Sequence, residues 1–331
     1  MTIGRVTTSQ IWSSSTANIQ ASKARLSQLT AQSSSGLLVA KPSDDPVAAA
    51  SILKVLNQQS ANAQYTTNIA DGLTWLSTAD STMTSSENLV RQAKDLAIQA
   101  GNSGTATPAS RNAIATQLEG IRDDLLSAAN TKVNGRSIFA GTSDAAAAFT
   151  AAGVFAGSTT TTSTTNGTTT TSTVTGSVQR RIGSEPTDLV TVSADGSAAF
   201  GAGTTASPSV FQQIQGVIDA LRSPGYDTDT PDPVTGRTPK EAVTAGIDLL
   251  NTALTNLSAQ HAVLGANYAR MTSAKTQNAT TATALETQRS GLQDADTTKT
   301  LLDLKTQELA YQTALQVTAQ VIQPTLMSFL S

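Results

Sequence analysis

Apolar residues recur every seven positions at both ends of this chain, and the stretch between the ends lacks that period. From Pro46 to Ala100 the period is interrupted only by Asn62 and runs through Val55, Ile69, Leu76, Met83, Val90 and Ala97. It returns in steps of three, four or their sums at Val243, Ile247, Leu250, Leu254, Leu257, Leu264, Tyr268, Met271, Ala282, Leu285 and Leu292. Such spacings form one stripe on a helix, which needs a partner helix to bury it. We therefore predict a long antiparallel helical bundle or coiled coil formed by both chain ends.

The stretch between the helical ends has a different composition. Residues 158–175 are almost entirely Thr, Ser, Gly and Asn, and residues 178–200 alternate in short runs between turn residues, which predicts β-strands. Asn134-Gly135 predicts a hairpin followed by a strand over 136–141, and the apolar spacing in 210–222 predicts a short helix. The expected fold class is mainly α with an inserted outer β domain.

Short local motifs predict where the helices begin and end. Asp45 can cap a helix whose first residue is Pro46, and Thr238–Glu241 is a capping box with Pro at the first helical position. Ser33–Gly36 is expected to end the first helix. Pro324 is expected to end or bend the last one, because proline lacks an N–H donor.

Composition excludes several classes of function. The net charge of −3 gives no electrostatic reason to expect nucleic acid or a membrane surface as a partner. The absence of cysteine excludes disulfides, thiolate metal sites and cysteine nucleophiles. No apolar run approaches the ~20 residues of a membrane span, and the N-terminus does not resemble a cleavable signal peptide. We expect a protein that is cytoplasmic or exported without such a signal.

Candidate catalytic and metal-binding residues are few, and we expect no cofactor and no bound metal. His261, the single histidine, falls on the apolar stripe and is expected to be a partly buried structural residue rather than a base or ligand. Asp227, Asp229 and Asp232 form a loop cluster whose spacing does not fit a calcium loop. Residues 201–206 match a dinucleotide-binding fingerprint only loosely, without a βα unit around them.

Motifs near both ends carry a family resemblance. They are Ser34–Leu37 with Lys41–Ala50, then Lys94–Ala100, and finally Ser290–Asp296. Their order and their distances from the termini are similar to those of the bacterial flagellin superfamily. Asn134–Thr142 and the ending Pro324–Leu330 further resemble the branch that joins hook to filament, although 320–324 also resembles the tail of filament subunits.

The resemblance implies a non-enzymatic structural subunit of the bacterial flagellum, forming a ring layer at the hook–filament junction. The alternative within the superfamily is a short flagellin that builds the filament itself. Implied partners are hook-associated protein 1, flagellin-type subunits, further copies of this chain and a flagellar export chaperone. The implied location is extracellular, after type III export.

The resemblance also implies a division into domains. Residues 1–43 and 291–331 would form an inner coiled-coil domain. Residues 44–141, with a terminal hairpin, and 238–290 would form a helical shell domain, and 142–237 would be the outer β-rich domain. Two other classes stay open as rivals: a coiled-coil signalling rod, disfavoured because the β insertion occupies the place of its tip, and an enzyme contained in 142–237.

The expected functional residues are of two kinds. The assembly interface is predicted to comprise Trp12, Ile19, Leu26 and Leu29, with Leu301, Leu315, Ile322 and Phe329 opposite them. A structural turn is predicted at Asp44, Asp45 and Pro46, and Asp294 and Asp296 are expected to cap the last helix, where negative charge is favourable.

Overall fold

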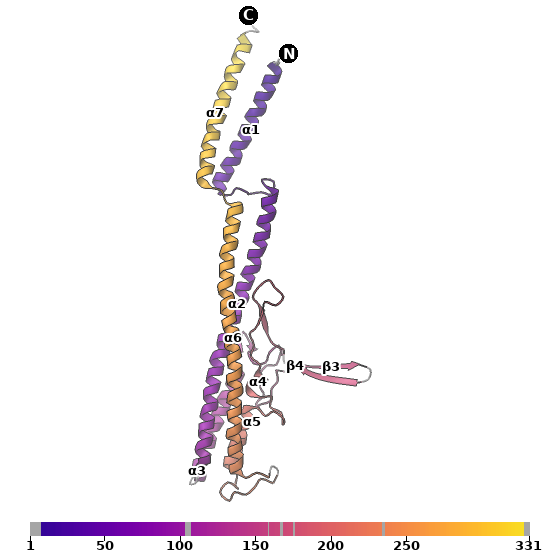
Figure 1. Ribbon diagram of the computed structural model, residues 1–331, viewed down its shortest axis with the longest axis vertical. Coiled ribbons are helices and arrows are strands. Elements are labelled where there is room, and N and C mark those ends of the chain that lie inside the picture. Colours follow the sequence, from indigo (N-terminus) through magenta and orange to yellow (C-terminus); the bar gives the residue numbers. More distant parts are fainter. Residues whose placement is uncertain are drawn as a thin grey trace. The chain divides into compact units, whose positions relative to one another are not determined.

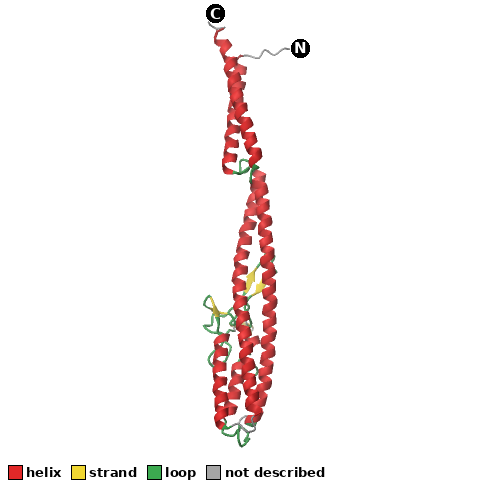
Figure 2. Cartoon of the chain, turned by 90° about the vertical axis from the view of Figure 1, so that its left-hand side faces the viewer, coloured by secondary structure: helices red, strands yellow, loops and turns green. Residues whose placement is uncertain are grey.

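The computed structural model describes residues 8–102, 107–157, 159–165, 168–174, 176–233 and 236–327, with only the backbone at 8, 9, 11, 159–165, 168–174 and 320–327. Helices dominate, which confirms the predicted fold class (Figures 1 and 2). The long helices are α1 (Thr8–Ser35), α2 (Pro46–Asn102), α3 (Pro108–Ala129), α6 (Pro239–Gln293) and α7 (Thr297–Met327). Internal contacts divide the chain into a terminal unit, Met1–Asn62 with Thr280–Ser331, and a central unit, Ala63–Ala279.

Within the central unit, α2 and α6 run antiparallel along the predicted seven-residue seam. One register accounts for their contacts, because Thr66 accepts a 2.6 Å hydrogen bond from Asn278 and Gly101 lies against Val243. Tyr268 is the exception, since it faces solvent instead of the seam. The buried seam residues are Ile69, Leu76, Met83, Val90, Ala97, Val243, Leu250, Leu257, Leu264 and Met271.

Gly72 allows the β insertion and α6 to approach α2 closely. A Cβ atom at this position would lie 2.6 Å from Met271 Cε and 3.2 Å from a methyl of Val192. Beside it, Arg180 donates a 2.7 Å hydrogen bond to Asp71 and lies over the ring of Trp75. Glycine at position 72 lowers the helix propensity of α2. The close packing around Gly72, which a larger residue would prevent, compensates for that loss.

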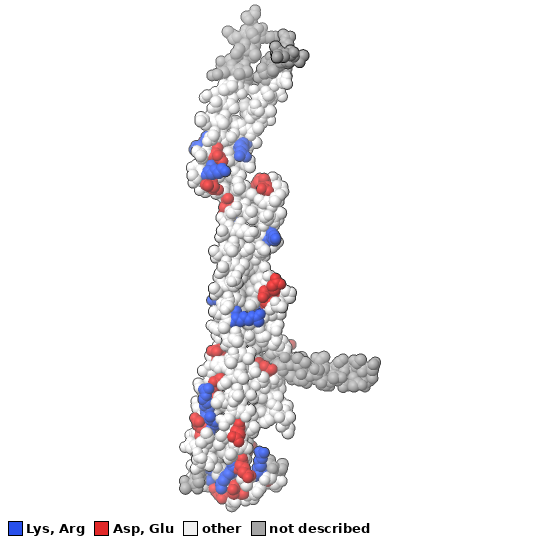
Figure 3. Space-filling model, viewed as in Figure 1, with Lys and Arg blue, Asp and Glu red and all other residues white. Residues whose placement is uncertain are grey.

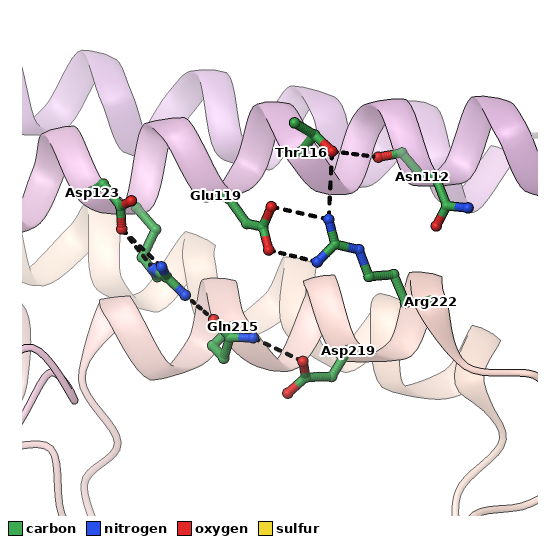
Figure 4. Close-up of polar contacts among 8 residues, drawn as sticks. Asn112, Thr116, Glu119, Asp123, Gln215, Asp219 and Arg222 are labelled. Carbon is green, nitrogen blue, oxygen red and sulfur yellow. Dashed lines mark hydrogen bonds and ion pairs between the residues drawn. The ribbon is translucent and has the colours of Figure 1, made fainter.

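The short helix α5 (Val210–Arg222) packs along α3 (Figure 4). Arg222 forms a bidentate ion pair with Glu119, and the Nη2–Oε2 distance is 2.9 Å. Arg122 of α3 donates to Gln215 of α5, which in turn donates to Asp219. The apolar faces beneath this polar row close the core, through Ile114, Leu118, Leu125, Ile214, Val217, Ile218 and Leu221.

Strand content in residues 142–237 is smaller than predicted. The strands are β3 (Thr159–Thr165) paired with β4 (Thr168–Val174), and β5 (Gln179–Arg181) paired with β6 (Leu189–Thr191). The Asn134-Gly135 hairpin is present, but its strands β1 (Lys132–Val133) and β2 (Arg136–Ser137) are shorter than the predicted 136–141.

The predicted strand at the end of 178–200 is wrong, because the chain forms α4 (Gly196–Phe200) there. Asp195 caps this helix by accepting hydrogen bonds from the backbone N–H groups of Ser197 and Ala198. Gly201 ends it at φ 86°. Local capping therefore overrode the alternating pattern.

The insertion shares one hydrophobic core with the helices of the central unit. Phe200 of α4 contacts Phe139, Phe149 and Phe211, with ring centroids 5.2 to 5.8 Å apart. Phe211 belongs to α5, and its ring lies 5.1 Å from that of Phe149. Since these rings belong to the same buried cluster as the α2–α6 seam, the insertion and the helices stabilise each other.

In the terminal unit, α1 packs on α7. The helix α7 continues through Pro324 to Met327, so this proline does not end the helix, and the alternative that it bends the helix stays a prediction. A proline removes one N–H donor and disturbs the turn before it. That cost falls on the turn that precedes Pro324, close to the last described residue of α7.

Candidate functional site

The connectors between the helices of the terminal unit are hydrogen-bonded to each other. Leu37, just after α1, forms an antiparallel bridge with Asp294, just after α6. The backbone N–H of Leu38 donates to the carbonyl of Gln293 at 2.7 Å, and that of Ala295 donates to Gly36 at 2.9 Å. We call residues 36–45 and 294–296 the paired connectors. Through them, the point where α1 gives way to α2 is tied to the point where α6 gives way to α7.

Aspartates begin the helix on each side of the paired connectors. Asp45 accepts hydrogen bonds of 2.9 Å from the N–H groups of Val47 and Ala48, with Pro46 as the first residue of α2. Asp296 does the same for the second and third residues of α7, at 2.9 and 3.0 Å. Asp44 instead accepts from two N–H groups of its own connector. Each carboxylate satisfies donors that would otherwise be unpaired.

Asp294 lies in the turn and does not cap α7, contrary to expectation. Its Oδ1 lies 3.5 Å from Arg289, an α6 residue that also pairs with Glu286 at 2.7 Å and donates to Gln293. The hydrogen bond from Arg289 holds the pKa of Glu286 below its ordinary value. Asp294 lies three residues before Thr297, the first residue of α7, so it is too far from the free N–H groups of this helix. Asp296 accepts hydrogen bonds from those groups instead.

The face of α1 toward α7 contains the predicted residues Ile19, Leu26 and Leu29. Leu29 is buried, and Ile19 and Leu26 are half-buried. The register of the pair is set where Gln307 of α7 donates a 2.8 Å hydrogen bond to the hydroxyl of Ser22. These residues hold the two arms of one chain together.

The predicted residues of α7 lie elsewhere. Leu301 and Leu315 are 53% and 42% exposed, while the face toward α1 has its own period of seven: Thr300, Leu304, Gln307, Tyr311, Ala314 and Thr318. Leu301 and Leu315 therefore do not oppose Ile19 and Leu26 within one chain. Ile322 lies where only the backbone is described, and Phe329 lies outside the described residues.

The helix α7 also has a second, exposed set of apolar residues, which the seven-residue pattern did not predict. Leu302 and Leu309, seven apart, are about two-thirds exposed, and Val317 is half-exposed. On α1, Trp12 is also half-exposed although it falls in the same period as Ile19 and Leu26. The missed signal was that α7 carries more leucines than one partner helix can cover.

One stretch of each arm helix carries no charged side chain. Residues 8–22 of α1 and 309–327 of α7 contain no Lys, Arg, Asp or Glu. In Figure 3 the charged residues of the arms gather near the paired connectors. Such a surface could be buried against other chains without removing any ionised side chain from water. Removing charged groups from water is a large free-energy cost of burying a polar helix.

No group of three or more His, Cys, Asp or Glu residues with metal-binding geometry occurs in the described part of the chain. His261 is partly buried between two carboxylates, and Asp227 forms an ion pair with Arg111 at 2.7 Å. None of the described helices combines the length and apolarity needed to cross a lipid bilayer.

The terminal unit thus pairs two antiparallel helices beside hydrogen-bonded connectors, and the central unit is a helical bundle that carries an insertion. The family comparison is more specific. Residues 6–144 match the bacterial flagellin N-terminal helical region, and residues 247–330 match the flagellin C-terminal helical region. Because the two regions together make up well over half of the sequence, this chain belongs to the bacterial flagellin family.

Individual proteins of known name differ in how much of this chain they match. Flagellar hook-associated protein 3 of Salmonella typhimurium is 28% identical over 314 residues, which are 93% of this chain and 94% of the relative. A flagellin of Bacillus subtilis is 28% identical over only 111 residues, 33% of this chain and 36% of that protein. The crystal structure of FlgL from Xanthomonas campestris has the same fold, with a TM-score of 0.54 and 16% identity, covering 71% of this chain and 99% of that one.

Proposed function

We propose that this chain is a structural, non-enzymatic subunit of the bacterial flagellum that forms the junction layer between hook and filament. On the hook side it would contact hook-associated protein 1, and on the filament side flagellin-type subunits. The extent of the match supports the junction role over the alternative of a short flagellin. Nearly the whole chain aligns with hook-associated protein 3, whereas only a third aligns with a flagellin.

One observation carries the proposed mode of assembly. Trp12 lies as far from Ser22 along α1 as Val317 lies from Gln307 along α7, and Gln307 and Ser22 are hydrogen-bonded. Trp12 and Val317 are therefore level in the antiparallel pair. Both are about half-exposed, at 51% and 53%.

Level, exposed apolar residues on two helices suit contact with the next copy. In a layer of identically oriented subunits, the α1 face of one copy would meet the α7 face of its neighbour at the same height. Trp12 would then bury its ring against Leu315 and Val317 of the partner subunit, as large aromatic residues do at the centre of interfaces. Because residues 8–22 and 309–327 contain no charged side chain, a contact between these two stretches would bury no ionised side chain.

Export and the domain division belong to the same proposal. We infer that 1–43 and 291–331 form the inner domain, 44–141 and 238–290 the shell, and 142–237 the outer part. Export would use the flagellar type III route without a cleavable signal. A chaperone that covers Leu302 and Leu309 would keep these exposed leucines from aggregating before export.

Electron microscopy and a deletion strain test the junction role. The purified chain, under conditions that polymerise flagellin, should not form long filaments, because a junction layer is finite. A strain lacking the gene should keep its hooks and release unassembled flagellin into the medium. Long filaments of the purified chain would overturn the junction role and establish the flagellin alternative.

A further inference from the structure

The hairpin of β3 and β4 forms a sheet of its own. Its strands pair antiparallel over their full seven residues without a bulge, with Thr162 opposite Thr171 and Thr165 opposite Thr168. In the part of the chain that the structure describes, no third strand joins this pair. Figure 1 shows β3 and β4 pointing away from the helices of the central unit.

Alternate residues of each strand direct backbone groups outward. Only two positions separate Thr165 from Thr168, so that closing pair belongs to the hydrogen-bonded class of an antiparallel hairpin. The next pair along the ladder, and every second pair after it, belongs to the non-hydrogen-bonded class. The N–H and C=O groups of that class point away from the hairpin: Thr160, Thr162 and Thr164 on β3, and Thr169, Thr171 and Thr173 on β4.

These edges lack the features that natural proteins use to prevent strand addition. Such features are charged side chains, proline and β-bulges. The sequences of β3 and β4 contain only Thr, Ser and one Val, which favour strands, and no charge. The other sheet of the insertion differs, because β5 contains Arg180 and Arg181.

The partner that fits each edge is the opposite strand of another copy. The strands read TTTTSTT and TTTTSTV, so each edge offers almost the same sequence that it already pairs with inside the hairpin. We propose that the β4 edge of one copy pairs antiparallel with the β3 edge of the next, in the register seen within the chain. Thr171 would then lie opposite Thr162 of the partner subunit.

This arrangement satisfies every outward backbone group. Identically oriented hairpins placed side by side alternate β3 and β4, so every interface is antiparallel, and pairs that do not bond within a hairpin bond between hairpins. The orientation rests on the proposed ring layer. Strand addition would also stabilise the hairpin, since an isolated two-stranded sheet is only marginally stable in water.

Cysteine cross-linking of the purified full-length protein tests the pairing, because the natural chain has no cysteine. Two single variants, Thr162→Cys and Thr171→Cys, are mixed and oxidised. Residues opposite each other in a hydrogen-bonded antiparallel pair are close enough for a disulfide to form. We expect the mixed dimer to form faster than in a control mixture of Thr171→Cys with Ser81→Cys, which lies exposed on α2. Equal rates in the two mixtures would overturn the proposal.

A backbone variant separates strand pairing from chance collision. With cysteines at Thr164 and Thr169, adding Thr162→Pro to the β3 partner removes an outward N–H, whereas Thr162→Val keeps it. The proline should abolish the mixed dimer and the valine should retain it; retention with both would contradict strand pairing. Because these readouts use free protein, they are independent of the motility and filament measurements that decide the junction role.

Discussion

His261 on α6 places its Nδ1 atom 3.0 Å from Oε1 of Glu87 on α2. Its other ring nitrogen lies 2.9 Å from a carboxylate oxygen of Asp80, two turns earlier on α2. A neutral imidazole has one N–H, so only the protonated ring donates both hydrogen bonds. Glu87 is itself almost buried and also pairs with Arg91 at 2.8 Å.

The first prediction concerns pH. Burial of the ring disfavours its charge, but the hydrogen bonds with Glu87 and Asp80 outweigh burial, so the pKa of His261 is raised. The stabilisation is full below the unfolded-state pKa of about 6.5 and is lost as pH rises through the folded-state pKa. In urea melts, we expect the advantage of the natural chain over His261→Gln to shrink from acid to alkaline pH by about 1 kcal/mol. A pH-independent difference would contradict the ion-paired state.

The second prediction concerns the α2–α6 seam. Leu76 is 1% exposed, and Leu76→Ala should lower the free energy of unfolding by roughly 2–5 kcal/mol through lost burial and a cavity. Leu53 on the same helix is 60% exposed, so Leu53→Ala should change stability by less than about 0.5 kcal/mol. Denaturant melts followed by circular dichroism give both values. Similar losses for the two variants would argue against the seam.

The third prediction concerns the paired connectors. Gly36 has φ +70° with open space around its Cβ direction, so Gly36→Ala should cost about 1–2 kcal/mol from backbone strain alone. Gly291, helical and equally open, is the matched control, and Gly291→Ala should stabilise by up to about 1 kcal/mol. Hydrogen exchange at the N–H groups of Leu38 and Ala295 reports the local effect. If both substitutions change the stability in the same direction, the left-handed conformation of Gly36 is not the cause of the effect.

The fourth prediction concerns the arms. Trp12→Ser should leave the melting of the monomer unchanged and reduce motility and incorporation into flagella, because the half-exposed ring would act only between copies. Leu29→Ser should instead reduce the helicity of the monomer, because Leu29 is buried. Circular dichroism of the free protein and immunoblots of isolated flagella separate the two effects. Normal incorporation of the Trp12 variant would remove this residue from the interface.

The fifth prediction concerns the insertion. Replacing 142–237 by a Gly/Ser linker should abolish cooperative melting of the remaining helices, because Phe149, Phe200 and Phe211 share their core. Replacing only 159–174 should leave melting unchanged, since β3 and β4 form a separate sheet. Calorimetry of the two deletions is the measurement. Cooperative melting after the larger deletion would make the insertion an independent domain.

Much of this molecule was determined by sequence alone, because the relevant interactions are local. The period of seven marks most of the buried positions between Val55 and Leu285, although Tyr268 and Ala282 on the same stripe are exposed. The caps at Asp45, Asp296 and Thr238 act on N–H groups two or three residues away. An apolar stripe on a helix and a helix cap both depend only on residues close together in sequence, so they can be predicted without the rest of the fold.

The tertiary structure alone decided which partner each surface meets. The α7 sequence carries more than one apolar stripe, and only packing against α1 selected Leu304 and Tyr311 over Leu301 and Leu315. Likewise, nothing near Gly72 in sequence indicates that Met271 and Val192 approach it. The periodicity shows that an apolar face must be buried. Which segment packs against that face depends on contacts between residues far apart in the chain.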